Sequence, residues 1–185
     1  NDASIDVRDD EEDNQVSGDP TEEALLVLSK KAGIHEHEDF KHIEKLDDLP
    51  FNSEQKFRAS LIKNEEGDKE MLFVGAPEKM LELSDKYLSG RGKEDLKDNK
   101  ADEIKKQIEE FSRQSMRVIG CAYKPVEEDK EEVDTEDAEN LVFAGLFGII
   151  DPPRPEVKNA VDECKSAGIR VIMVTGDHKQ TASAI

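Results

Sequence analysis

The sequence is short of cysteine, tryptophan and positive charge. It has two cysteines and no tryptophan among 185 residues. Cys121 and Cys164 both stand among apolar residues, with no Cys or His at the spacing of a metal ligand. We therefore expect a cytosolic chain without disulfides or a zinc site. Lys and Arg number 26 against 45 Asp and Glu, a formal charge of −19. This balance excludes a protein that binds nucleic acid or an anionic membrane through bulk positive charge.

Long apolar runs are also missing. The longest, Leu141 to Ile150, contains two glycines and is far shorter than the roughly 20 residues that cross a bilayer. The acidic stretches Asp9 to Asp13 and Glu127 to Glu139 have too few apolar residues to pack, and neither has the spacing of an EF-hand, so we expect solvated loops. The sequence begins at Asn1 without a signal-like segment and stops within an apparent helix, so we expect a piece excised from a longer protein.

The first part of the chain is rich in helix and strand patterns of the α+β kind. Asp19-Pro20-Thr21-Glu22 is typical of a helix start, and Gly33 suits its end. Alternation in Phe57 to Ile62, a turn at Asn64 to Gly67 and the apolar Met71 to Val74 predict an antiparallel hairpin. Further elements are expected at three places: a helix over Pro77 to Lys86, a helix over Ala101 to Gln114 and a strand over Arg117 to Tyr123.

The last part has a different pattern. Leu141 to Ile150 and Ile169 to Val174 resemble strands buried on both faces, with a helix from Pro155 to Gly168 between them. This order predicts part of a parallel, doubly wound unit. Thr175-Gly176-Asp177 follows the second of these strands, at the edge where open α/β sheets place ligands. On spacing alone, a turn with a helix-capping Asp explains the motif better than a ligand site does.

The segment from Asp151-Pro-Pro-Arg154 to Thr175-Gly176-Asp177 closely resembles the phosphorylation domain of P-type cation-transporting ATPases, and the similarity spans Leu141 to Ile185. The rest resembles the nucleotide-binding (N) domain that this family inserts there. Three motifs match: Gly18-Asp19-Pro20-Thr21-Glu22 for G-[DE]-x-[ST]-E, Phe51 to Lys56 for F-x-S-x-x-K, and Gly75-Ala76-Pro77-Glu78 for G-A-P-E.

The resemblance implies a fold and a division of the chain. Residues 1–150 would form an α+β N domain, an antiparallel sheet flanked by helices. Residues 151–185 would form a hinge and a partial phosphorylation domain, a β-α-β-α stub of a doubly wound, haloacid-dehalogenase-like fold.

The resemblance also implies functional residues. Phe51 would stack on adenine, Glu22 would accept a hydrogen from the adenine amino group, and Arg117 would lie near the phosphates. The implied nucleotide-binding set is Glu22, Phe51, Ser53, Lys56, Gly75, Ala76, Arg117, Asp151 and Arg154. Thr175, Gly176 and Asp177 would support the γ-phosphate and the Mg²⁺ that arrives with ATP, and no separate metal site is expected. From the residues alone, the pattern favours a core aromatic for Phe51 and a solvated surface charge for Lys56 and Arg117, and Glu22 could be only a capping acid.

Two departures from the family pattern matter. Val74 stands where the family usually has a Lys before G-A-P-E, which removes a cation from the nucleotide pocket and predicts weaker ATP binding. D-K-T-G-T is absent, so the phosphorylated aspartate is missing and we expect the isolated fragment to be inactive. The implied partners are ATP and the remaining phosphorylation, actuator and transmembrane domains of a pump. We expect a location on the cytoplasmic side of the membrane, without membrane insertion by this segment or nucleic-acid binding. The residues do not specify the transported ion.

Two other classes of protein remain open. A soluble haloacid-dehalogenase-like phosphatase has a similar core, although the missing D-x-D-x-T and the presence of Phe51, Lys56 and G-A-P-E argue against it. A non-catalytic acidic module could dock a basic partner through Asp9 to Asp13. Nucleotide titration separates the second class from an ATP-binding domain.

Overall fold

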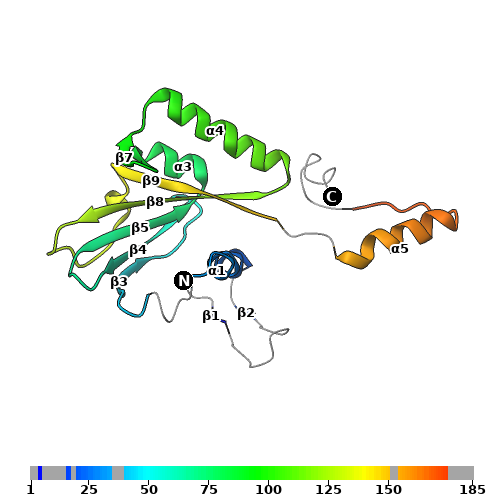
Figure 1. Cartoon of the computed structure of the whole chain (residues 1–185), viewed down its shortest axis with the longest axis horizontal. Helices are drawn as coiled ribbons and strands as arrows, with labels where there is room; N and C mark the ends of the chain where they lie inside the picture. The colour runs from blue at the N-terminus through cyan, green and yellow to red at the C-terminus, as the bar shows by residue number, and fades with distance from the viewer. Residues whose placement is uncertain (1–3, 6–15, 18–19, 35–39, 151–153, 175–185) are drawn as a thin grey trace.

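The computed structural model describes residues 4–5, 16–17, 20–34, 40–150 and 154–174. The described strands form one two-stranded and one seven-stranded sheet, with helices on both faces of the larger sheet (Figure 1). The strands are β1 (Ser4–Ile5), β2 (Val16–Ser17), β3 (Glu44–Leu49), β4 (Phe57–Lys63), β5 (Lys69–Gly75), β6 (Ser84–Ser89), β7 (Gly92–Asp95), β8 (Arg117–Val126) and β9 (Leu141–Ile149). The helices are α1 (Pro20–Lys31), α3 (Pro77–Glu82), α4 (Asp98–Arg113) and α5 (Pro155–Ser166), with a 3-10 turn η1 (Thr135–Asp137). The predicted α+β class is confirmed.

The larger sheet has the strand order β3-β4-β5-β8-β9-β6-β7. All neighbours are antiparallel except β6 and β9, which are parallel. The expected β4–β5 hairpin is confirmed, and its register runs from Phe57 opposite Gly75 to Lys63 opposite Lys69. Asn64 closes the turn, because its side-chain Oδ1 accepts a hydrogen bond of 2.9 Å from the backbone of Asp68.

The core lies on the face of this sheet that α3 and α4 cover (Figure 1). Phe57 and Phe73 meet edge to face there, with ring centroids 5.8 Å apart. Ile104 and Ile108 of α4 are buried against the same cluster, as the helical stripe predicts. Gly120 of β8 allows this close approach, because a Cβ added to it would lie 2.8 Å from the backbone of Pro77.

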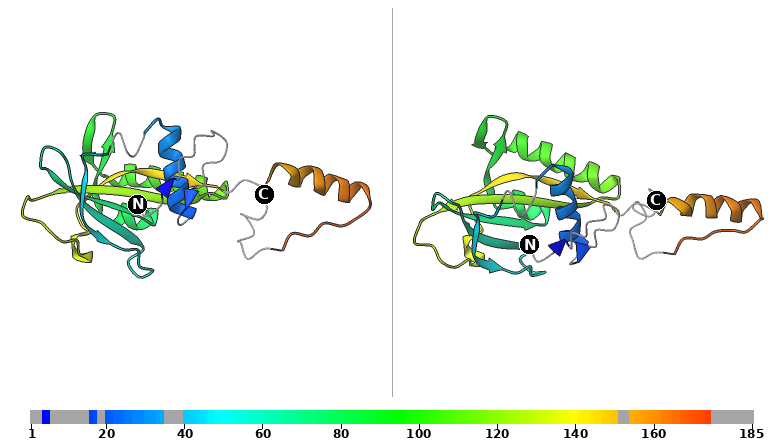
Figure 2. Two further views of the ribbon diagram at one scale, coloured as in Figure 1. Left: turned by 90° about the horizontal axis from the view of Figure 1, so that it is seen from below. Right: turned by 60° about the horizontal axis from the view of Figure 1, so that its bottom comes forward.

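The other face of the sheet, here called the open face, is crossed by α1 (Figures 1 and 2). Successive side chains of a strand point to opposite faces, so the residues that alternate with the core residues of β4, β5 and β8 belong to it. On these three strands the open face includes Arg58, Ser60, Leu72, Val74, Arg117, Ile119, Cys121 and Tyr123. The predicted helix α1 is confirmed and is followed by Gly33 at φ 74°; its expected cap, Asp19, lies outside the described residues.

The expected helix over Pro77 to Lys86 is shorter than predicted. It ends at Glu82, and the chain turns at Leu83 into β6. The carbonyl of Leu83 accepts a hydrogen bond of 3.0 Å from the backbone of Leu141, so pairing with β9 competes successfully with continuation of the helix. The polar strands β3, β6 and β7 were not predicted, because their sequences lack the apolar alternation that signals a strand.

The acidic stretch Glu127 to Glu139 is not simply a solvated loop, so this prediction was wrong in part. Ala138 is buried, and Val133 packs against the core. The backbone N–H of Val133 also donates a hydrogen bond of 2.7 Å to Asp47 of β3, and this bond lowers the pKa of that carboxyl. The other stretch, Asp9 to Asp13, lies outside the described residues.

The expected parallel unit at the end of the chain is corrected. Leu141 to Ile149 does form a strand, but β9 pairs antiparallel with β8 and belongs to the sheet of the first part. It is buried only at its start, from Leu141 to Phe143. Helix α5 is confirmed, whereas Ile169 to Val174 forms no strand and its side chains are exposed. A strand needs a neighbour for its backbone groups, and none pairs with this segment among the described residues.

Candidate functional site

Arg58 of β4 joins the first turn of α1 to the open face. Its Nη1 donates a hydrogen bond to Oε1 of Glu22 within an ion pair, and the two side chains are 22 % and 15 % exposed. Nη2 of Arg58 lies 3.7 Å from Oδ1 of Asp48, which also accepts a hydrogen bond of 3.0 Å from Ser60. The guanidinium therefore lies between carboxylates from α1 and β3. Because the pair is shielded on one side by the sheet, it is screened less than an exposed ion pair.

Arg117 of β8 reaches the same turn of α1. Its Nη1 donates a hydrogen bond of 3.2 Å to the hydroxyl of Thr21, the residue before Glu22. In the sheet, β5 lies between β4 and β8. Two arginines thus approach α1 from either side of β5, in a chain whose overall charge is strongly negative. This end of the open face is where an anionic ligand would find cations.

The loop between β3 and β4, residues 50–56, presents an aromatic ring to solvent. Phe51 is 62 % exposed, which rules out a core role. Asn52 shapes the loop, because its side chain accepts a hydrogen bond of 2.8 Å from the backbone of Glu54 and its carbonyl accepts one of 2.7 Å from Lys56. Gln55 adds two hydrogen bonds of 2.9 and 2.8 Å to backbone carbonyls on either side of the loop. The ring therefore projects from a loop held by its own hydrogen bonds.

The end of this loop is joined to the G-A-P-E turn. The carbonyl of Lys56 accepts a hydrogen bond of 2.9 Å from the backbone of Ala76. Lys56 itself has a positive φ of 62°. A Cβ added to Gly75 would lie 2.4 Å from that same carbonyl oxygen, so only glycine fits there. The structure thus brings together Lys56, Gly75 and Ala76, which the sequence analysis assigned to one site from two separate motifs.

Val74 of β5 lies on the open face. Its neighbour Phe73 is buried, and alternation turns Val74 to the other side. In the β4–β5 register, Val74 stands directly opposite Arg58. On its other side it stands opposite Cys121 of β8, where burial raises the pKa of the thiol to about 12. The open face beside Val74 is therefore flanked by one cation and one neutral thiol.

The other predicted site residues fall into two groups. Ser53 is exposed in the same loop as Phe51, and Arg154 is exposed just before α5. Asp151, Thr175, Gly176 and Asp177 lie outside the described residues.

Sequence reasoning did not single out two residues of this site, Arg58 and Asp48. The alternation of β4 does place Arg58 on the polar side of the strand, but Asp48 comes from a strand that was not predicted, so their pairing has no signal in the sequence.

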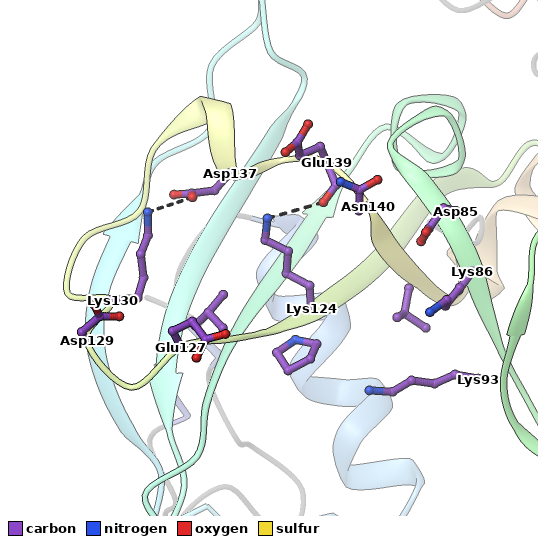
Figure 3. Close-up of a pocket in the computed structure, with 13 residues that line it drawn as sticks. Asp85, Lys86, Lys93, Lys124, Glu127, Asp129, Lys130, Asp137, Glu139 and Asn140 are labelled. Atoms are coloured by element: carbon purple, nitrogen blue, oxygen red, sulfur yellow. Dashed lines mark hydrogen bonds and ion pairs between the residues drawn. The ribbon is translucent and has the colours of Figure 1, made fainter.

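A separate hollow of about 560 Å³ lies on another part of the sheet, between β6, β7, the end of β8 and the loop that follows it (Figure 3). Its lining mixes lysines with carboxylates. Lys130 forms an ion pair of 2.8 Å with Asp137, and Lys124 donates a hydrogen bond of 3.4 Å to the carbonyl of Glu139. It shares no residue with the three motifs, and its five carboxylates and four lysines nearly balance, so its charge does not point to a ligand of either sign.

No group of three or more His, Cys, Asp or Glu side chains is placed to hold a metal ion within the described ranges. Of the helices that the structure describes, none combines the length and the apolar character needed to cross a membrane.

Comparison with known proteins identifies the family. The family model described as "P-type ATPase, cytoplasmic domain N" matches residues 1–156. The calcium-transporting ATPase 1 of Lactococcus lactis is 38 % identical over 94 % of this chain and 20 % of its own length. The cation-transporting ATPase pma1 of Synechocystis is 40 % identical over 100 % of the chain and 20 % of its own length. The sodium/potassium-transporting ATPase subunit alpha-1 of Catostomus commersonii is 40 % identical over 92 % of the chain and 18 % of its own length.

The chain thus spans about a fifth of the length of these relatives. The family model covers α1, the seven-stranded sheet and the three motifs that meet around its open face. The chain therefore belongs to the family of P-type ATPase cytoplasmic N domains.

Proposed function

We propose that this chain binds ATP on the open face of its sheet, as the nucleotide-binding part of a P-type cation pump. The observation that supports this most directly is the meeting of three motifs far apart in the sequence. Ala76 bonds to Lys56, Arg58 next to that loop pairs with Glu22, and Arg117 bonds to the turn that holds Glu22. A structural role alone does not require an exposed aromatic ring and several cations at one end of one sheet face.

The proposed roles follow from the chemistry of each side chain. The exposed ring of Phe51 offers a stacking surface for adenine. The carboxylate of Glu22 can accept a hydrogen from the adenine amino group. Lys56 lies near the adenine end, Gly75 and Ala76 form the floor beside it, and Arg117 bonds to phosphate oxygens. Ser53 is assigned to the same pocket.

In the whole pump, the domain would present the γ-phosphate of ATP to an aspartate outside this sequence, and phosphoryl transfer would drive cation transport. D-K-T-G-T does not occur in the 185 residues, so we expect no turnover by this chain alone. Mg²⁺ would arrive with ATP and neutralise phosphate charge.

We assign residues 1–150 to nucleotide binding and residues 151–185 to the hinge and the start of the phosphorylation domain. Asp151 and Arg154 would belong to the hinge beside the nucleotide, and Thr175, Gly176 and Asp177 to the phosphoryl site. The partners of this chain would be the remaining phosphorylation, actuator and transmembrane domains of the pump. The chain itself would lie on the cytoplasmic side of the membrane. The named relatives transport different cations, so the transported ion is left unassigned.

An NMR titration of the ¹⁵N-labelled chain with ATP tests the proposal. We expect a dissociation constant between about 0.1 and 1 mM, or on the order of −4 to −5.5 kcal/mol, because the surface is open and Val74 replaces a cation. Shifts should concentrate at Glu22, Phe51 and Gly75. Helix α4, on the opposite face, is the internal control. No shifts at ~10 mM ATP, or shifts of equal size on both faces, would contradict the proposal.

A further inference from the structure

Arg58 stands directly opposite Val74 in the β4–β5 register, and both residues are on the open face. Side chains at directly opposite positions of antiparallel strands have Cβ atoms about 4.5–5.5 Å apart. A long cationic side chain at position 58 can therefore reach the space that a lysine at position 74 would reach. Position 74 has a valine where the family usually has a lysine, and position 58, directly opposite, has an arginine.

The partner of Arg58 indicates what this cation does. Its guanidinium binds Oε1 of Glu22 and lies near Asp48 on its other side, so it links α1 to two strands of the sheet. The Glu22 side chain is 15 % exposed, which leaves part of it accessible to a ligand. A carboxylate held in this way has a fixed direction, so less order is lost when it accepts a hydrogen bond from a ligand.

We propose that Arg58 is the positioning residue for base recognition: from the strand beside Val74 it holds the Glu22 carboxylate toward the purine, and so selects a 6-amino over a 6-oxo purine nucleotide. This inference rests on the proposed binding of ATP at the open face. A carboxylate oxygen accepts a hydrogen from a 6-amino group, whereas the 6-oxo group of the other purine is itself an acceptor and repels that oxygen at the same position. Selectivity depends on the carboxylate being held in place, which is the contribution of Arg58.

The test compares the affinities of ATP and ITP, which differ at this position of the purine. The wild-type chain should bind ATP about tenfold more tightly than ITP. Arg58→Met should reduce that ratio to about twofold or less, with most of the loss on ATP. Combining Arg58→Met with Val74→Lys should restore at least half of the lost ratio, because lysine returns a cation to the opposite position of the same strand pair.

Arg113→Met is the matched control. Arg113 lies on α4 and also pairs with a carboxylate, that of Glu109 at 3.1 Å, but on the opposite side of the sheet. Its removal should leave the ratio unchanged. Thermal melts of every variant report folding. Should Arg58→Met melt before the titration temperature, Arg58→Lys replaces it: a retained cation should keep most of the ratio, and a complete loss of the ratio in that folded variant would overturn the proposal.

The outcomes separate this inference from the function on which it rests. If Arg58→Met lowers the affinities for ATP and ITP by the same factor, Arg58 only attaches α1 to the sheet. That result overturns the inference and leaves the proposed ATP binding intact. A double variant no better than Arg58→Met also overturns it. Absence of ATP binding by the wild-type chain contradicts the proposed function itself. Glu22→Gln reports on Glu22 directly, because an amide can donate to the 6-oxo group and should shift the preference toward ITP.

Discussion

Two side chains of the candidate site, Phe51 and Arg117, should contribute to nucleotide binding in different ways. Phe51→Ala removes a stacking surface and should weaken ATP, ADP and adenosine alike, by about 0.5–1.5 kcal/mol beyond the lost contact area. Arg117→Ala removes a charged donor and should weaken ATP and ADP more than adenosine. Calorimetric titration of the three ligands measures both patterns.

Stability measurements provide the control for this pair. Phe51 is largely exposed, so Phe51→Ala should change the free energy of unfolding by no more than about 0.5 kcal/mol. Equal losses for all three ligands in both variants would refute the assignment of one residue to the base and the other to the phosphates. A large fall in the melting temperature of Phe51→Ala would show that this ring stabilises the fold.

Cys121 gives the open face a pH-dependent contribution to stability. Burial raises the pKa of its thiol from 9.0 to about 12. Between these values the unfolded chain releases the thiol proton and the folded chain keeps it, so the free energy of unfolding should fall as pH rises above 9. By pH 10.5 the loss should approach about 1–2 kcal/mol.

Urea unfolding at pH 8 and pH 10.5 measures this contribution. Cys121→Ala is the comparison. Lysines titrate in the same pH range in the wild-type chain and in this variant, so their effect on the free energy of unfolding cancels. The wild-type chain should lose more stability than the variant between the two pH values. An equal loss in both would show that the thiolate is tolerated in the folded chain.

At the scale of elements, the predictions succeeded where a pattern is local. The alternation of β4 and β5, the stripe of α4 and the start of α1 depend on neighbouring residues, and each is found where it was expected. Strand β6 failed because Ser84–Ser89 is polar and becomes a strand only through its pairing with β9, a distant segment. Ile169 to Val174 failed for the opposite reason: its apolar sequence suits a strand, but no neighbour pairs with it in the described part of the chain.

The candidate site shows the same difference between local patterns and contacts between distant segments. The motifs that contain Glu22, Phe51 and Gly75 were recognised from sequence because each is a short run. The pairing of Arg58 with Glu22 was not, because it depends on where α1 lies on the sheet.

The contact between α3 and β8 leads to a prediction at this scale. A Cβ at Gly120 would lie 2.8 Å from the Cα of Pro77, a backbone atom that cannot move by changing rotamer, and 3.1 Å from Met80. Gly120→Ala should therefore destabilise the chain by about 1–3 kcal/mol. Gly145→Ala in the adjacent strand β9 is the matched control, since nothing lies within 4 Å of its added Cβ. Chemical denaturation compares the two, and a Gly120→Ala variant as stable as Gly145→Ala would show that α3 can move away from the sheet without cost.

At the scale of the whole molecule, the buried cluster and the pairing of the large sheet are complete before α5 begins. The buried cluster runs from Phe57 to Phe143, and the last strand of the sheet ends at Ile149. The chain after that contributes α5 and an exposed apolar segment, in which Ile172 is 67 % and Val174 92 % exposed. Folding of the first part should therefore not depend on residues 151–185.

A chain ending at residue 150 tests this division. Its melting temperature should lie within about 3 °C of that of the full chain, because the described residues after 150 include no strand and no member of the buried cluster. Its ATP affinity should fall by no more than about twofold, because the one cation assigned to the nucleotide from this segment, Arg154, is exposed, and Arg154→Ala in the full chain should reproduce that loss. Light scattering should show less self-association, because an exposed apolar segment has been removed. A truncated chain that melts well below the full one would place part of the stabilising core after residue 150 and contradict the proposed boundary.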